Sequence, residues 1–268
     1  RWNDGSTDNS EEIAREMAEM DSRFRIFGGK RIGHAQSLVR SCAEAHGRYI
    51  GVLDSDDLLE PTALEETTAI LESRPEIGMV YTDHVVIDGN GQRRGLGRRC
   101  QIPFSKDRML LDFMTFHFRL IRMEAFAQVK GFDETYPLAM DYDLCLRLAE
   151  VTEIEHLRTP LYRYRVHRAS LSCQKRLEQI QCSYDAVVAA MKQKNSPMLP
   201  CCRSSPDCRE NTMMTMPVAR IRYLKKTAKG SMTYIVPKRI LGSLLVNAIV
   251  SIARTKPSIT TSPVVVPE

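Results

Sequence analysis

The sequence lacks the features that would assign it to a special class of protein. No apolar run reaches the roughly 20 residues that a membrane-spanning helix needs. No apolar segment follows Arg1 as it would in a secretory signal peptide, so we expect a cytoplasmic protein or a fragment of one. The composition, 43% hydrophobic and 26% charged, is that of an ordinary globular chain and excludes wholesale disorder and fibrous folds.

Paired short cysteine spacings are also absent. The eight cysteines do not show the pattern of a zinc ribbon or of a small disulfide-rich scaffold, so we expect reduced thiols. Cys201, Cys202 and Cys208 cluster in a polar stretch, which we interpret as loop thiols because no histidine lies nearby.

The net charge of +5 is mild for 268 residues. It argues against nucleic-acid binding and only weakly suggests an acidic ligand or a membrane surface.

What the first part of the sequence does contain is an alternation of strand and helix patterns. Apolar runs of strand length occupy residues 24–27, 49–53, 78–86 and 112–122. Helical patterns cover residues 7–21, 35–45, 61–73 and 123–129, and another begins near residue 141. This alternation predicts an open α/β sheet flanked by helices. Ligands bind to such sheets at the carboxyl ends of the strands.

The pattern changes after Ser172. Residues 174–194 look helical, residues 195–207 are rich in Pro, Ser and Cys, and the remainder is basic and weakly patterned. We therefore place a domain over residues 1–173 and a mainly helical or irregular extension over residues 174–268. Within the extension, the apolar residues 240–253 suit a buried or interfacial helix, which would allow peripheral membrane contact.

The strongest local motif is Asp54-Ser55-Asp56, which directly follows the apolar run 49–53. Side chains alternate along an extended chain, so Asp54 and Asp56 can point the same way. Two converging carboxylates repel one another unless a cation or hydrogen-bond donors compensate. A divalent Mg or Mn ion bridging to a substrate diphosphate would compensate them. The alternative is an acidic turn that caps the helix starting near Pro61.

Two later segments carry further candidates. Asp141 lies where a loop becomes a helix, from which a carboxylate can act as a general base; the alternative is a helix cap. The segment 162–172 is rich in cations and includes Arg165 and His167. Arginine recognises phosphate well and histidine can bind a metal, although a solvated basic edge strand would have the same composition.

Taken in this order, and together with the opening Asp4-Gly5-Ser6, the three segments resemble the inverting family 2 glycosyltransferases of the GT-A fold. The resemblance covers residues 3–172. It implies an open mixed sheet flanked by helices and transfer of a sugar from a nucleotide-diphosphate sugar to an acceptor hydroxyl. The implied partners are a nucleotide-sugar donor and a glycan, lipid-linked or protein acceptor, at the inner membrane face or in the cytoplasm.

The resemblance also implies residue roles. Asp4, Asp54 and Arg165 match positions that bind the nucleotide sugar, Asp56 and His167 match the metal site, and Asp141 matches the catalytic base.

The sequence departs from the family pattern at three places. The family's first strand, which would precede Asp4, is missing, so the sheet is expected to lack one strand. Ser37-Leu38-Val39 replaces an Ala-Arg-Asn stretch, and Met140 replaces a glutamate.

Two alternatives remain open at this point. Without its first strand, the chain could be an inactive or truncated nucleotide-sugar-binding fragment. Leu53-Asp54-Ser55-Asp56 also resembles the nucleophile strand of haloacid-dehalogenase-like phosphatases, although Asp57 stands where that group has Thr or Val.

Overall fold

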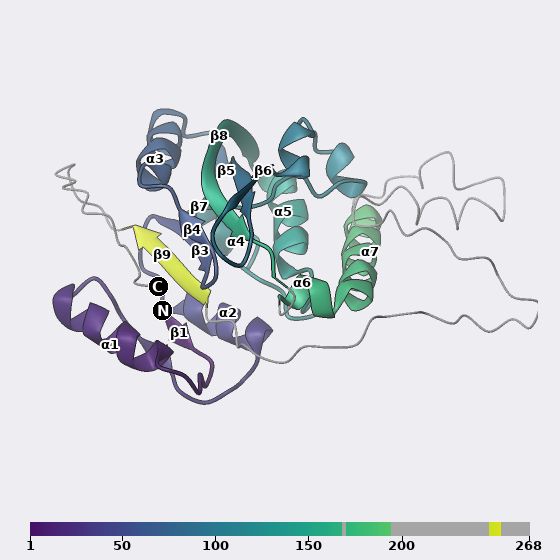
Figure 1. The fold of residues 1–268 in the computed structure, drawn as a ribbon. Helices are drawn as coiled ribbons and strands as arrows, with labels where there is room; N and C mark the ends of the chain where they lie inside the picture. The colour runs from purple at the N-terminus through teal and green to yellow at the C-terminus, as the bar shows by residue number, and fades with distance from the viewer. Residues whose placement is uncertain (168–169, 194–246, 253–268) are drawn as a thin grey trace, which may run out of the picture.

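A mixed sheet of seven strands forms the centre of the protein (Figure 1). The structure is a computed structural model that describes residues 1–167, 170–193 and 247–252. The strands of the main sheet are β3 (Tyr49–Asp54), β4 (Leu58–Leu59), β5 (Ile77–Ile87), β6 (Arg93–Leu96), β7 (Arg119–Arg122), β8 (Glu153–Arg165) and β9 (Asn247–Ile252). They lie in the order β4-β8-β5-β7-β3-β9, with β6 paired to β5. Strands β5 and β8 are parallel, and the other pairs of this sheet are antiparallel.

Helices cover both faces of the sheet. They are α1 (Ser10–Met20), α2 (His34–Ala43), α3 (Ala63–Ser73), α4 (Met123–Gln128), α5 (Met140–Val151), α6 (Leu171–Gln174) and α7 (Arg176–Gln193), with 3-10 turns η1 (Arg98–Gln101) and η2 (Arg108–Leu110). A separate parallel pair, β1 (Trp2–Asn3) and β2 (Phe27–Gly28), lies beside α1 and α2 at the lower left of Figure 1. The predicted α/β architecture with flanking helices is confirmed.

The alternation of side chains along the strands divides the core into two clusters. Ile50 and Ile121 belong to the cluster shared with α5, whereas the adjacent Tyr49 and Leu120 pack with Leu71 of α3 on the opposite face. Residues of even number on β3 and of odd number on β7 therefore face α5. This parity decides which side chains at the strand ends can meet the start of α5.

The helix predictions agree with the structure to within a few residues, but two strand predictions were too long or displaced. The apolar run 112–122 forms a strand only from Arg119, because the residues before it fold as loop and bury Phe113 and Met114 in the core without strand pairing. The run predicted at 24–27 pairs only at Phe27–Gly28.

Strand β9 lies antiparallel along the outer edge of β3, with Ile252 opposite Tyr49 and Asn247 opposite Asp54. The predicted helix over 240–253 is therefore wrong for residues 247–252, where the β-branched Ile249, Val250 and Ile252 favour an extended chain. The sheet was expected to lack one strand; in the structure β9 forms its edge beside β3. Residues 240–246 and residue 253, together with Cys201, Cys202 and Cys208, lie outside the described residues.

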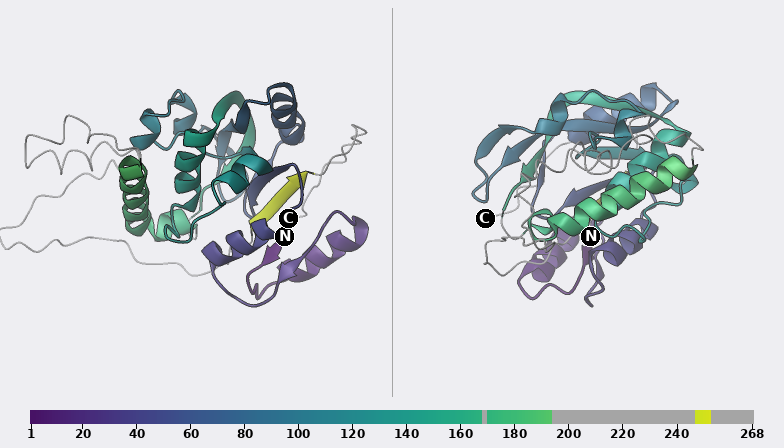
Figure 2. Two further views of the ribbon diagram at one scale, coloured as in Figure 1. Left: turned by 180° about the vertical axis from the view of Figure 1, so that it is seen from behind. Right: turned by 90° about the vertical axis from the view of Figure 1, so that its right-hand side faces the viewer.

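The boundary predicted near Cys173 falls within α6. The following helix, α7, packs over α5 on the outside of the molecule (Figure 2). The described start of the extension therefore contacts the first predicted domain.

Gly51 of β3 has no room for a side chain. A Cβ there would lie 2.8 Å from the Phe118 ring and 3.1 Å from the Arg119 carbonyl oxygen, both in the buried layer beneath the strand end. We expect Gly51→Ala to destabilise the fold by about 1–3 kcal/mol, as measured by chemical denaturation. Gly89→Ala is the control, because nothing lies within 4 Å of its added Cβ. Equal stability of the two variants would contradict this packing.

Candidate functional site

Asp54 ends β3 and, by the strand parity, points to the face of the sheet that carries α5. Its side chain keeps 23% of its surface exposed, yet it lies in a recess where burial raises its pKa to about 7. The charges of Asp56 and Asp141 raise this pKa further, and that of Arg119 lowers it. Asp54 therefore lies within electrostatic reach of carboxylates from two distant stretches of the chain.

The loop after Asp54 is fixed to strand β8. The hydroxyl of Tyr162 and the backbone N–H of Arg165 donate hydrogen bonds to the buried Asp57 carboxylate at 2.7 and 2.6 Å. The Arg165 Nε donates to the carbonyl oxygen of Asp56 at 2.7 Å. Arg165 Nη1 donates to the carbonyls of Asp88 and Gly89, so this side chain ties the Asp54–Asp57 loop to the β5–β6 turn. Its predicted contact with a nucleotide sugar stays a prediction.

Asp56 and His167 are paired. The His167 Nε2 lies 2.8 Å from Asp56 Oδ2, and both side chains are about one quarter exposed, at 24% and 23%. Two adjacent ligands of an octahedral ion, each about 2.1 Å from it, lie roughly 3 Å apart, so this spacing fits the two predicted metal ligands. Among the residues that the structure describes, no group of three or more His, Cys, Asp or Glu side chains forms a metal cage. A donor set of this size suits an ion whose shell is completed by substrate phosphates and water.

Asp141 lies in the first turn of α5, as predicted. Its Oδ2 accepts hydrogen bonds from Arg119 Nη2 at 3.3 Å and Nη1 at 3.4 Å, and Asp141 keeps 32% of its side-chain surface exposed. Arg119 itself is buried on β7 and also donates to the Thr115 carbonyl at 3.0 Å. The carboxylate is therefore held in place by a fixed cation while one side remains accessible.

His117 and Arg119 link Asp54 to Asp141 through a series of close contacts. The His117 Nε2 lies 3.6 Å from Asp54 Oδ2, and its Nδ1 lies 3.4 Å from Arg119 Nη2. Burial, together with the neighbouring Arg119, holds the pKa of His117 well below its usual range, so the ring is neutral. The end of β3, strand β7 and the start of α5 thus meet in one site.

Asp4 has a different environment from that expected of a ligand-binding carboxylate. It is buried, and its Oδ1 accepts hydrogen bonds from the backbone N–H groups of Ile32 and Gly33 at 2.6 and 3.1 Å. These bonds join the loop after β1 to the start of α2. His34, the first residue of α2, has a pKa lowered by burial, and the charges of Asp141 and Asp4 oppose that shift. Asp4 therefore lies next to the site, and its role in nucleotide binding stays a prediction.

The sequence analysis missed Arg119, His117, Tyr162 and Asp57. The signal that could have found Arg119 is a charged residue directly before the apolar pair Leu120-Ile121, because a cation at a buried strand position needs a partner. Nothing in the sequence could have identified that partner as Asp141.

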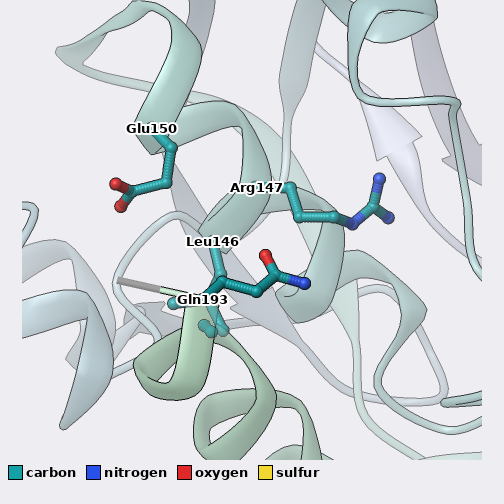
Figure 3. Close-up of a pocket in the computed structure, with 5 residues that line it drawn as sticks. Leu146, Arg147, Glu150 and Gln193 are labelled. Carbon is teal, nitrogen blue, oxygen red and sulfur yellow. The ribbon is translucent and has the colours of Figure 1, made fainter. Parts of the chain in front are cut away.

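One hollow in the structure lies away from this site. A hollow of about 230 Å³ lies between α5 and α7 and is lined by Leu146, Arg147, Glu150, Ala190 and Gln193 (Figure 3). It contains none of the site's aspartates. Along α5 its lining begins five residues after Asp141, about 7 Å along the helix axis.

Asp57 gives the fold a pH dependence. Burial raises its pKa to about 8, although the hydrogen bonds from Arg165 and Tyr162 oppose the shift. The native state therefore keeps this proton up to about pH 8, whereas the unfolded chain releases it near about pH 3.9. The contribution of this proton to the free energy of unfolding is fully present below the pKa of the unfolded chain. It is lost as the pH rises toward 8.

We expect the melting temperature of Asp57→Asn, relative to the unmodified protein, to increase between pH 5 and pH 8. Thermal unfolding at both pH values measures this difference. A difference that does not change with pH would contradict the raised pKa.

Comparison with known proteins identifies the family. The sequence model of glycosyl transferase family 2 matches residues 2–130, which include Asp4, Asp54, Asp56 and Arg119. Over these residues the chain is a family 2 glycosyltransferase. Asp141, Arg165 and His167 lie beyond the matched residues, and the roles that the sequence resemblance implies for them stay predictions.

Two synthases are similar to part of this chain. A hyaluronan synthase from Pasteurella multocida is 32% identical over 173 residues, which are 65% of this chain and 18% of the synthase. A chondroitin synthase from Pasteurella multocida strain Pm70 is 33% identical over 165 residues, 62% of this chain and 17% of that protein. The chain spans less than a fifth of the length of these two relatives.

A solved structure supports the architecture. A mannosyltransferase from Pyrobaculum calidifontis, in complex with GDP-Man and Mn2+, superposes with a TM-score of 0.51 at 16% identity, covering 80% of this chain and 58% of that one. This likeness concerns the fold, and it agrees with the predicted GT-A type sheet. Of the described helices, none is both long and apolar enough to cross a bilayer.

Proposed function

We propose that this chain transfers a sugar from a nucleotide-diphosphate sugar to an acceptor hydroxyl, with inversion, during the assembly of a glycan or polysaccharide. The observation that carries the proposal is that carboxylates from the end of β3 and the start of α5 meet in one site, with Arg119 between them. The family and the two synthases, which are named for polysaccharides, support it.

The donor would bind at the loop after β3. Asp56 and His167 would hold a Mg or Mn ion, which when bound supplies Lewis-acid stabilisation of the charge that develops on the departing nucleoside diphosphate. Asp54, at the end of the strand, would contact the nucleotide sugar beside this pair. Tyr162 and Arg165 bond to Asp57 and to the Asp56 carbonyl, so the backbone of this loop is held against β8 before the donor binds.

The acceptor would bind beside α5. Asp141 would remove the proton from the acceptor hydroxyl as that oxygen attacks the anomeric carbon, and the leaving group would depart from the opposite side. Such a displacement in one step inverts the anomeric centre. Arg119 would keep the Asp141 carboxylate in the orientation for attack, since its guanidinium is itself anchored to the Thr115 carbonyl.

The acceptor class is a glycan, a lipid-linked glycan or a protein, and the site of action is the cytoplasm or the inner membrane face. The net charge of +5 is compatible with such a surface.

A transfer assay tests the proposal. The purified chain is incubated with UDP- and GDP-sugars, oligosaccharide acceptors and Mn2+, and nucleoside diphosphate release and the lengthened product are measured. We expect release that depends on both acceptor and metal. Donor binding without transfer would instead favour a binding fragment, and phosphate release from small phosphoesters without sugar transfer would favour a phosphatase.

A further inference from the structure

Arg99, on the 3-10 turn η1, is a cation that makes no side-chain hydrogen bond or ion pair with the residues that the structure describes. Its guanidinium carbon lies 4.5 Å from the ring centre of Phe116 and 5.1 Å from that of Phe113. Throughout residues 1–167, 170–193 and 247–252, no oxygen accepts a hydrogen bond from this half-buried guanidinium. The two rings hold the cation, but they satisfy none of its N–H donors.

Arg99 shares an aromatic ring with the arginine that holds the proposed base. Arg119 lies 5.6 Å from the ring centre of the same Phe113 and bonds to Asp141. Burial lowers the pKa of Arg99, and the charge of Asp141 is the largest influence that opposes this shift. An arginine remains charged despite such a shift.

A ligand is expected where such a group lies unpaired. No Arg99 nitrogen is among the buried side-chain atoms that lack a hydrogen-bond partner, so its donors can reach solvent and are open to a ligand. A bound anion would replace water at these donors with charge-assisted hydrogen bonds. The planar fork of a guanidinium matches a carboxylate with two parallel hydrogen bonds. A neutral ligand would leave most of the charge uncompensated.

We propose that Arg99 binds the carboxylate of an acidic acceptor sugar, so that the acceptor is a glycan containing uronic acid. This inference rests on the proposed function, because it takes Asp141 as the group that contacts the acceptor hydroxyl. The donor diphosphate is assigned to Asp56 and His167, whereas Arg99 shares the Phe113 ring with Arg119, which bonds to Asp141 at the start of α5. Arg99 thereby determines acceptor specificity and takes no part in the bond-making step.

The test compares two acceptors, an oligosaccharide ending in a uronic acid and its carboxyl-reduced neutral counterpart. The unmodified protein should prefer the acidic acceptor by about tenfold or more in kcat/KM, as expected for charge-assisted hydrogen bonds. Arg99→Gln should lose that preference, with little change in the KM for the nucleotide sugar or in the rate with the neutral acceptor. Arg99→Lys, which keeps a cation over the two rings, should restore part of the preference.

Arg98→Gln is the matched control, since Arg98 is an exposed arginine on the same turn. It should behave as the unmodified protein. Equal use of both acceptors by the unmodified protein would overturn the inference. So would an Arg99→Gln variant that weakens donor binding as much as acceptor binding.

Direct binding separates this inference from the proposed function. Titration of the acidic oligosaccharide into the protein without donor should show affinity that Arg99→Gln reduces about tenfold and Arg98→Gln leaves unchanged. If no sugar is transferred to any acceptor, the proposed function fails, while this titration still decides the role of Arg99. Unchanged affinity of a folded Arg99→Gln variant, verified by its melting temperature, would overturn the inference.

Discussion

Asp141→Asn should reduce sugar transfer by about 100- to 10,000-fold, the usual contribution of a general base. Asparagine keeps an oxygen that can accept a hydrogen bond from Arg119, which also retains its bond to the Thr115 carbonyl, so the fold should survive. The change removes the group that takes the acceptor proton and leaves the donor site intact. Steady-state kinetics and nucleotide titration together measure the two effects.

Donor affinity should therefore stay nearly unchanged in this variant. Asp133→Asn is the control, because Asp133 bonds to the backbone of Thr135 in the preceding loop and should tolerate the change with full activity. If donor binding falls as severely as transfer, Asp141 would be part of the donor site and the assignment of the base would be wrong.

Asp56→Ala should remove the part of nucleotide affinity that depends on Mn2+ or Mg2+. The carboxylate pairs with His167 at 2.8 Å, so its loss leaves the imidazole as the remaining ligand of the predicted pair. An ion that prefers oxygen ligands has little affinity for such a site. Nucleoside diphosphate is titrated with and without the metal. The metal should raise the nucleotide affinity of the unmodified protein and should leave that of the variant unchanged.

Two comparisons sharpen this prediction. His167→Ala should reduce the metal-dependent part of the nucleotide affinity less than Asp56→Ala does, because the Asp56 carboxylate remains. Asp21→Ala removes a carboxylate that pairs with Arg23 after the end of α1, and it should leave the metal-dependent part of the nucleotide affinity unchanged. If Asp56→Ala keeps the full metal-dependent part of the nucleotide affinity, the ion binds elsewhere.

The features of the site that the sequence predicted are those that local patterns can encode. An apolar run of strand length that ends in acidic residues indicated Asp54 and Asp56, and a helix that begins with a carboxylate indicated Asp141. Both the strand and the helix lie where the patterns placed them. Neither pattern states that the two elements are neighbours, so their meeting was inferred from the family resemblance.

The supporting residues could not be predicted because they depend on strand pairing. Arg119 faces Asp141 only because β7 lies between β3 and β5, and Tyr162 reaches Asp57 from β8, more than 100 residues later in the chain.

The secondary structure of residues 247–252 was predicted wrongly for another reason. A short apolar run fits a buried helix and a strand equally well, and only the available edge of β3 decides between them.

The most direct test of this account is the position of a bound metal and nucleotide. In crystals grown with Mn2+ and a nucleoside diphosphate, the anomalous signal should place one ion about 2.1 Å from the Asp56 carboxylate, with the diphosphate on the face of the sheet that carries Asp141. An ion remote from Asp56, or a nucleotide bound on the α3 face, would contradict it.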